Sequence, residues 1–243
     1  MHWTFHGLKL ALVSAAMGAA ASASGQYAAG PTYDPRALEA NIQESLKSRM
    51  ELLERPAEQS GQWDIASRYA RCAISLNEDR VRLLLDQGVE GKAPRRLEFE
   101  DFLRRNKGCV IASDNLDRDV LRAAMAEQIV TAMETALPPP GSSESVTAFI
   151  RSVKVPQMDK NNPFAAGQLL AECRVGFAPV AARALIATEP GSLAEAGALA
   201  AMKAVTPQCD NLDTAKTKLT PWFERAFASQ ALYHWIGFGR DKG

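Results

Sequence analysis

Apolar residues recur at steps of three and four along much of this chain of 243 residues. One such face comprises Leu121, Ala124, Met125, Ile129, Ala132 and Met133, and another comprises Phe99, Phe102 and Leu103. A spacing near 3.6 residues is that of an α-helix with one buried face. Strict alternation of apolar and polar residues, which would indicate strands, is nearly absent. The pattern predicts an all-α fold, with one candidate strand at Val146 to Val155.

The N-terminal residues have the order of a secretory signal peptide. Lys9 precedes an apolar, Ala-rich run from Leu10 to Ala20, and small residues end the segment at Ala21-Ser22-Ala23. This is the order of n-region, h-region and cleavage site. A permanent membrane anchor would need about 20 strongly apolar residues, and a lipoprotein would need a cysteine at the cleavage point, whereas the first cysteine is Cys72. We expect cleavage after Ala23, a periplasmic or secreted protein, and no membrane span after cleavage.

The four cysteines suggest an internal repeat. Cys72 and Cys109 are 37 residues apart, and Cys173 and Cys209 are 36 residues apart. The two halves match in order: Tyr69–Cys72 with Leu170–Cys173, Leu84-Leu85 with Leu185-Ile186, Phe99 and Phe102 with Leu199 and Met202, and Leu121–Val130 with Glu224–Tyr233. The offsets of these matches are 101, 100 and 103 residues. They predict two tandem helical repeats of about 70 residues each.

The predicted organisation has five segments: a signal peptide (1–23), an N-terminal segment (24–60), a first repeat (61–136), a linker (137–163) and a second repeat (164–243). The N-terminal segment holds an amphipathic helix at Leu38 to Leu53, and the linker begins with the turn-forming Pro138-Pro139-Pro140-Gly141. Each repeat should contain a cysteine-bearing helix, a short helix, a third helix ending near the second cysteine, and a long closing helix. Asn77 is expected to cap the short helix, and Pro190-Gly191-Ser192 to precede the third helix of the second repeat.

An even number of cysteines in an exported chain predicts disulfides. Four cysteines allow three connectivities, and spacing alone does not choose among them. If each repeat once stood alone, Cys72 pairs with Cys109 and Cys173 with Cys209. Closing a loop of this size would stabilise each unit by about 4 kcal/mol in the chain-entropy model.

The repeated order of a cysteine, a Leu-Leu or Leu-Ile pair, a second cysteine and the Arg-Ala pairs Arg122-Ala123 and Arg225-Ala226 resembles a group of proteins. These are uncharacterised exported helical proteins of Gram-negative bacteria with a duplicated two-cysteine unit. The resemblance spans Ala66 to Trp235 and implies no activity.

Charge excludes two classes of partner. Lys plus Arg equals Asp plus Glu at 28 each, and removal of residues 1–23 leaves a net charge of −1. There is no global positive field to recruit nucleic acid or an anionic membrane surface. We expect neither as a partner.

Composition also limits catalysis. The mature chain keeps one histidine, His234, since His2 and His6 fall in the signal peptide. A serine or cysteine nucleophile generally needs a histidine base, and close-spaced cysteine pairs for zinc or thiol redox chemistry are missing. No metal, cofactor or catalytic residue is therefore expected. Acidic clusters offer a carboxylate-based hydrolase as a remote alternative, although solvated helix faces explain them better; their members are Glu98, Glu100, Asp101, Asp114, Asp117 and Asp119.

Five residues remain as candidates for binding: Arg122, Arg225, His234, Trp222 and Trp235. The two arginines are equivalent in the alignment, where Glu127 also matches Gln230. We expect them to hold helix-end carbonyls or a carboxylate between helices, with a ligand anchor as the alternative. For His234 we expect a structural role, and for the aromatic C-terminal segment core closure, with a partner face or an apolar pocket as the alternative.

These observations favour a non-catalytic exported protein that binds another protein or an envelope component. The alternative is a small-ligand or lipid-binding module with an apolar pocket between the repeats. The identity of the partner is not encoded in any pattern above.

Overall fold

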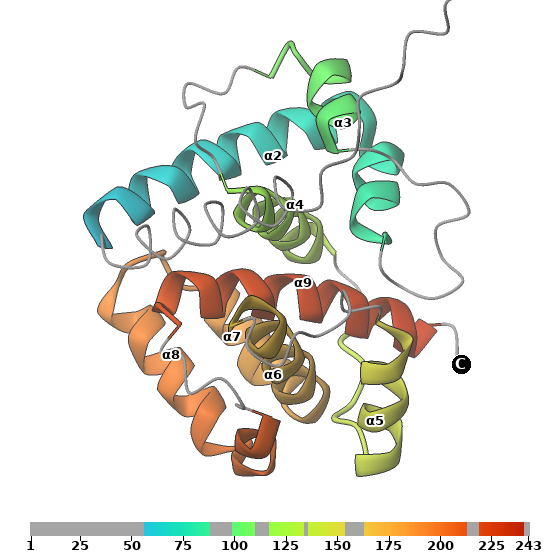
Figure 1. Ribbon diagram of the computed structural model, residues 1–243, viewed down its shortest axis with the longest axis vertical. Helices are drawn as coiled ribbons and strands as arrows, with labels where there is room; N and C mark the ends of the chain where they lie inside the picture. Colours follow the sequence, from blue (N-terminus) through green and yellow to red (C-terminus); the bar gives the residue numbers. More distant parts are fainter. Residues whose placement is uncertain are drawn as a thin grey trace, which may run out of the picture. The chain divides into compact units, whose positions relative to one another are not determined.

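The computed structural model describes residues 56–87, 99–109, 117–133, 136–153, 163–212 and 219–240 (Figure 1). All of them belong to the unit Gln43–Gly243. The predicted signal peptide and the predicted helix at Leu38 to Leu53 lie outside the described residues, as do Glu98 and Asp114.

The described chain is all-α, as predicted, and contains no strand in these ranges. Its elements are α2 (Pro56–Leu85), α3 (Phe99–Arg105), α4 (Arg118–Ala132), α5 (Ser143–Ser152), α6 (Pro163–Phe177), α7 (Pro179–Ile186), α8 (Leu193–Ala204), the 3-10 helix η1 (Pro207–Leu212) and α9 (Pro221–Arg240). No helix in the described part of the chain is long and apolar enough to cross a membrane.

The prediction of a strand at Val146 to Val155 is wrong, because residues 143–152 form α5. Ser142 begins this helix, and its Oγ accepts a hydrogen bond from the backbone N–H of Ser145. The buried residues Val146 and Phe149 lie three apart, on one face of the helix. The capping serine and this spacing outweigh the short run of β-branched residues.

Asn77 interrupts α2 as expected. Its backbone is non-helical (φ −165°, ψ 87°), and its Oδ1 accepts a hydrogen bond of 2.9 Å from the N–H of Arg80. Asn77 therefore acts as the N-cap of a second helical segment that ends at Leu85. Ser192 caps α8 in the same manner, after Gly191 turns the chain with a φ of 76° that favours glycine.

The same change of direction occurs in the second half. Ala178, 101 residues after Asn77, is also non-helical (φ −136°, ψ 59°) and separates α6 from α7. The short segments end 101 residues apart, at Leu85 and Ile186. The described helices thus follow the order expected of two repeats, while the duplication itself stays a prediction.

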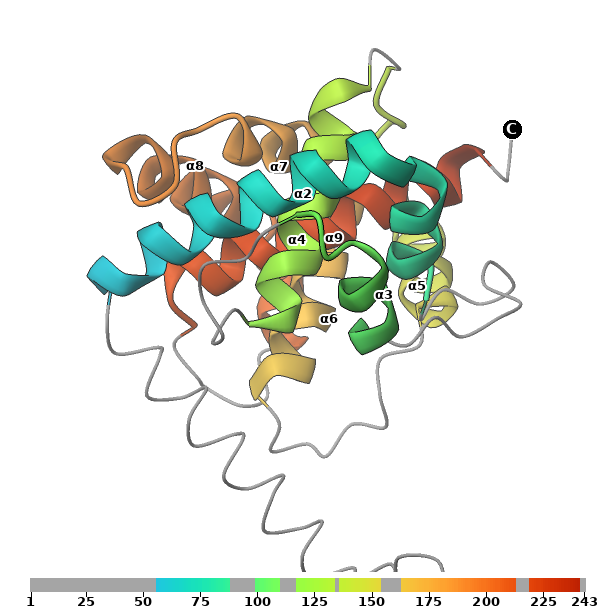
Figure 2. The ribbon, with the colours of Figure 1, turned by 90° about the horizontal axis from the view of Figure 1, so that it is seen from above.

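Helices α4 and α9 lie at the centre of the arrangement (Figures 1 and 2). The long α2 packs against α4, and α6 packs against α9. The short α7 and α8 pack against each other and against α9, and α5 packs against α6. One apolar core takes residues from both predicted repeats and from α5, among them Trp63, Met125, Phe149, Leu185 and Phe223. The two halves are therefore joined by a shared interior.

Both disulfides are internal to their half, as expected from the repeat. Cys72 pairs with Cys109 and ties α2 to the segment after α3. Cys173 pairs with Cys209 and ties α6 to η1. Cys173 and Cys209 pack with the buried Leu170 in a small apolar cluster separate from the main core.

Candidate functional site

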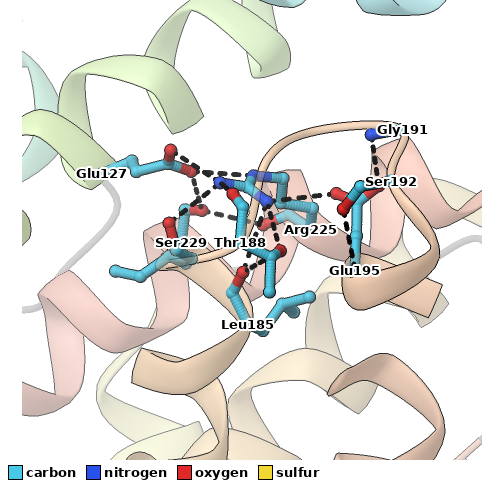
Figure 3. Close-up of polar contacts among 9 residues, drawn as sticks. Glu127, Leu185, Thr188, Gly191, Ser192, Glu195, Arg225 and Ser229 are labelled. Atoms are coloured by element: carbon cyan, nitrogen blue, oxygen red, sulfur yellow. Dashed lines mark hydrogen bonds and ion pairs between the residues drawn. The ribbon is translucent and has the colours of Figure 1, made fainter. Parts of the chain in front are cut away.

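Arg225 is the most heavily bonded side chain among the candidates. It comes from α9, is 1% exposed, and lies where α4, the end of α7 and the start of α8 meet (Figure 3). Its Nε and Nη2 donate to the two carboxylate oxygens of Glu127 at 3.0 and 2.8 Å. Its Nη1 donates to Glu195 Oε1 at 3.2 Å. The guanidinium thus holds two buried carboxylates at once.

The remaining donors of Arg225 bind the C-terminal end of α7. Carbonyl oxygens accept from its Nη groups at Leu185 (3.3 Å), Ile186 (2.9 Å) and Thr188 (3.0 Å). Carbonyls at the end of a helix lack the usual N–H partners from a following turn and accept from other groups instead; that of Leu185 also accepts from the N–H of Thr188 at 3.0 Å. A positive charge also stabilises the C-terminal end of the helix dipole. Every nitrogen of Arg225 is used inside the protein, so this arginine is a structural anchor.

The carboxylates around Arg225 are held in further ways. Burial raises the pKa of Glu127, and the hydrogen bonds from Arg225 act in the opposite direction. Ser229 Oγ also donates to Glu127 Oε2 at 3.3 Å. Glu195 Oε2 accepts from the backbone N–H of Gly191 at 2.7 Å, so this residue fixes the start of α8 as well. The ring of Trp63 lies 5.3 Å from the guanidinium carbon.

Arg122 has the corresponding role in the first half. Its Nη2 donates to the carbonyls of Leu85 at 3.3 Å and Gln87 at 3.2 Å, at the end of α2. Its Nε donates to Gln230 Oε1 at 3.3 Å. Burial lowers the pKa of this guanidinium. Glu127 and Gln230 are matched in the alignment of the two halves. Arg225 contacts Glu127 in the first half, and Arg122 contacts Gln230 in the second half.

His234 is buried and bonded on both ring nitrogens. Nε2 lies 3.2 Å from the Leu85 carbonyl, and Nδ1 lies 3.2 Å from Glu172 Oε1. A carbonyl oxygen only accepts, so Nε2 carries a hydrogen and donates it to the carbonyl of Leu85. Glu172 is fully buried, and its Oε2 has no hydrogen-bond partner among the described residues. The arrangement is that of an internal connection between α2, α6 and α9.

The two tryptophans close the core, as favoured from the sequence. Trp222 is buried and meets Trp63 edge-on, with ring centroids 6.4 Å apart. Trp235 is buried against Phe149 at 5.0 Å and stacks on Phe238 at 5.7 Å. Trp235 also lines a pocket at the end of α9.

Described members of the acidic clusters form ion pairs on the surface or cap a helix. Glu100 pairs with Arg118, and Asp101 pairs with Arg104, all on the surface. Asp117 caps α4 by accepting from the N–H of Asp119 at 2.8 Å. Within the described ranges, no three His, Cys, Asp or Glu residues form a group that could hold a metal ion. No acidic residue is among the described residues that line the pocket at the end of α9.

The outward face of α8 is a feature that the sequence analysis missed. The α8 face is defined here by the exposed residues of that helix and the residue after it: Leu193, Ala194, Ala196, Gly197, Ala200, Ala201, Ala204 and Val205. None of them is charged. The only charged residues of α8 are Glu195, buried on Arg225, and Lys203, which pairs with Glu224. Leu193 is 92% exposed and Val205 is 60% exposed.

The neighbouring α7 continues this tendency. Four large apolar side chains are exposed in the described part of the chain, and three of them, Val180, Leu193 and Val205, belong to α7, α8 or the residue after α8. Large apolar groups gathered on one surface element commonly mark a binding site. The repeated run of Ala and Gly at steps of three and four was the signal in the sequence that could have identified it.

Comparison with known proteins adds no assignment. No known protein family, no curated protein and no solved structure matches this chain.

Proposed function

We propose that this is an exported, non-catalytic protein that binds a helix of another protein through the α8 face. The single observation that carries the proposal is that none of the eight exposed residues of the α8 face is charged. A solvated helix of a globular protein ordinarily carries charged and polar residues on its outward face. Helix α2 follows that rule, with Asp64, Arg68 and Arg71 on its exposed side.

The corresponding helix of the first half provides an internal comparison. Residues 99–105 form α3, and its buried Phe102 matches the buried Met202 at an offset of 100. On the outward side α3 has Glu100, Asp101, Arg104 and Arg105, where α8 has Ala200, Ala201, Ala204 and Val205. Packing in this fold therefore does not require an uncharged surface at these positions. The absence of charge on α8 calls for a reason outside the fold.

The chemistry of the face defines its partner. Alanine and glycine side chains let two helix axes approach to the short end of the usual range of about 8 to 10 Å. The larger exposed side chains of Leu193 and Val205 lie at the two ends of the α8 face, and the Ala and Gly residues lie between them. With no charge to pair, the face favours an apolar surface, and its narrow width suits one helix. A helix of another protein is the occupant that meets these conditions.

Export is part of the same proposal. Two disulfides fit an oxidising compartment, and the N-terminal residues predict a cleaved signal peptide. N-terminal sequencing of the protein from its native cells should begin at Ser24. Recovery of uncleaved protein in the cytosolic fraction would contradict this part of the proposal.

A site-specific crosslinker tests the binding face directly. A photoreactive phenylalanine analogue is placed at Ala200 on α8, and at Glu100 on α3 as the control, in cells that produce the protein. We expect one partner to be crosslinked from position 200 and none from position 100. The partner is then identified, purified and titrated against the mature protein.

A matched variant makes the test specific. Ala200→Glu, Ala201→Asp, Ala204→Arg and Val205→Arg together give α8 the residues of α3, and the new acids and arginines stand four apart, which supports the helix. We expect the melting temperature to stay within a few degrees and binding of the purified partner to fall at least tenfold. Unchanged binding contradicts the proposal. So do a crosslinked dimer of the chain itself and adsorption to lipid vesicles in place of a protein.

A further inference from the structure

A pocket of about 460 Å³ lies where the proline run after α4 meets the last turns of α9. Its walls come from the segment 136–145 and from Trp235, Ile236, Phe238, Gly239 and Arg240. A volume of this size suits a small organic molecule. The pocket is separate from the α8 face.

Two glycines give the pocket its shape. A Cβ on Gly239 would lie 2.7 Å from Pro138 Cγ, so only glycine lets the proline run approach α9 this closely. A Cβ on Gly141 would lie 2.8 Å from Trp235 Cη2 and 2.8 Å from Val146 Cγ2. The N–H of Gly141 donates to the carbonyl of Gly176 at 2.8 Å, which fixes the turn. The walls are therefore held by close packing at the two glycines and by one backbone hydrogen bond.

The pocket combines an aromatic wall with one positive group. Trp235 and Phe238 both line the pocket and stack on each other, with ring planes 25° apart. The indole N–H of Trp235 is buried and has no acceptor among the described residues. Arg240 is the only charged residue among the described residues that line the pocket. Ser142 and Ser145 also line it, at the N-terminal end of α5, where the helix dipole favours an anion.

We propose that this pocket binds a small aromatic carboxylic acid. The ring lies on the wall of Trp235 and Phe238, where an offset-stacked arrangement is favourable. The carboxylate lies toward Arg240 and the first turn of α5. The acidic residue of that turn, Glu144, is exposed and does not line the pocket. The inference is independent of the proposed protein partner.

The probe is 2-naphthoate, and 2-naphthamide is its uncharged counterpart. Each is titrated into the mature protein by calorimetry and followed by the indole N–H signals in a nitrogen-correlated NMR spectrum. The Trp235 signal is assigned from its loss in Trp235→Phe. We expect saturable binding of 2-naphthoate, with the Trp235 signal moving and those of Trp63 and Trp222 staying in place.

Three variants separate the contribution of the positive charge to binding from that of the space inside the pocket. Arg240→Gln should weaken 2-naphthoate about threefold to fivefold, the weight of one exposed ion pair, and leave 2-naphthamide unchanged. Arg151→Gln, on the exposed end of α5 and outside the lining, should change neither. Ala136→Phe, placed in the lining, should reduce binding of both probes at least tenfold without altering the melting temperature.

Each opposite result overturns the proposal. Absence of saturable binding by 2-naphthoate at about 1 mM, an affinity near 4 kcal/mol, removes the site. Equal weakening of both probes by Arg240→Gln removes the carboxylate assignment. The α8 variant described above should bind 2-naphthoate as the unmodified protein does, so failure of one proposal leaves the other intact.

Discussion

Arg225 and Glu127 join the two halves through a two-pronged ion pair, with nitrogen to oxygen distances of 2.8 and 3.0 Å. The two residues are 98 positions apart in the chain. The counterpart pair, Arg122 and Gln230, lies at matched positions but is uncharged on one side. This difference allows the contribution of charge to be measured within one molecule.

Replacing Arg225 should therefore cost more than replacing Arg122. Arg225→Ala leaves the carboxylates of Glu127 and Glu195 buried without a cation, and we expect a loss of about 3 to 5 kcal/mol in the free energy of unfolding. Arg122→Ala removes hydrogen bonds to neutral acceptors, with an expected loss of about 1 to 3 kcal/mol. Urea unfolding of the two variants measures the difference. Equal losses would mean that the buried charges contribute little.

The shared core predicts one unfolding transition, although each half has its own disulfide. Cys173→Ala with Cys209→Ala should lower the free energy of unfolding by about 2 to 5 kcal/mol. Because core residues of both halves contact each other, tryptophan fluorescence and far-UV circular dichroism should still change together. The matching experiment removes Cys72 and Cys109. Two separate transitions in either variant would show that the halves unfold independently.

The buried hydroxyl of Tyr69 should make the folded state less stable at alkaline pH. Burial raises the pKa of its hydroxyl to about 12, above the ordinary value of about 10. The folded state thus favours the neutral phenol, so this stability is complete below about pH 10 and is lost as the pH rises toward 12. The loss amounts to at most about 3 kcal/mol. Urea unfolding at pH 8 and pH 11 measures it.

Tyr69→Phe is the control for that measurement. The hydroxyl has no hydrogen-bond partner among the described residues, so its removal should leave stability at pH 8 within about 1 kcal/mol. The alkaline loss should become smaller but not vanish. Tyr233 also has a raised pKa, chiefly from burial and then from the nearby Asp86. An unchanged alkaline loss in Tyr69→Phe would contradict the assignment.

Replacing a glycine by alanine should lower the stability of the protein at a packed position and raise it at an exposed helical position. Gly141→Ala forces a methyl group against Trp235 and Val146 and should cost about 1 to 3 kcal/mol. Gly61→Ala, in an exposed turn of α2 with open space around it, should raise stability by about 0.5 to 1 kcal/mol. Thermal unfolding of both variants checks the pair. A stabilising Gly141→Ala would show that the proline run can move away from α9.

Local signals in the sequence predicted the parts of the fold that depend on neighbouring residues. The cap at Asn77, the break at Pro190-Gly191-Ser192 and the order of helices all rest on residues within a few positions of one another. The disulfide pairs were expected only on the assumption that each predicted repeat once stood alone, since the cysteine spacing by itself left three connectivities open. The same local reasoning misassigned α5, because it gave the β-branched residues more weight than the capping Ser142.

The contents of the candidate site depended on contacts between distant segments. Arg225 could be expected to hold a helix end, yet nothing near Glu195 in the chain shows that this residue would share the same guanidinium from 30 residues away. Likewise the pocket arises from segments about 100 residues apart, Pro138 and Gly239 among them. The α8 face could have been found by comparing residues 100–105 with residues 200–205 for charge.

The position of α9 after all the other described helices has a consequence for how the chain is made. From a helix that is synthesised after these elements, contacts are made to α2, α4, α6 and α7 by Arg225, Gln230 and His234. The earlier helices therefore remain without their central partner while the chain is still emerging. The shared apolar core is therefore completed only after α9 has been synthesised, because the core includes residues of that helix.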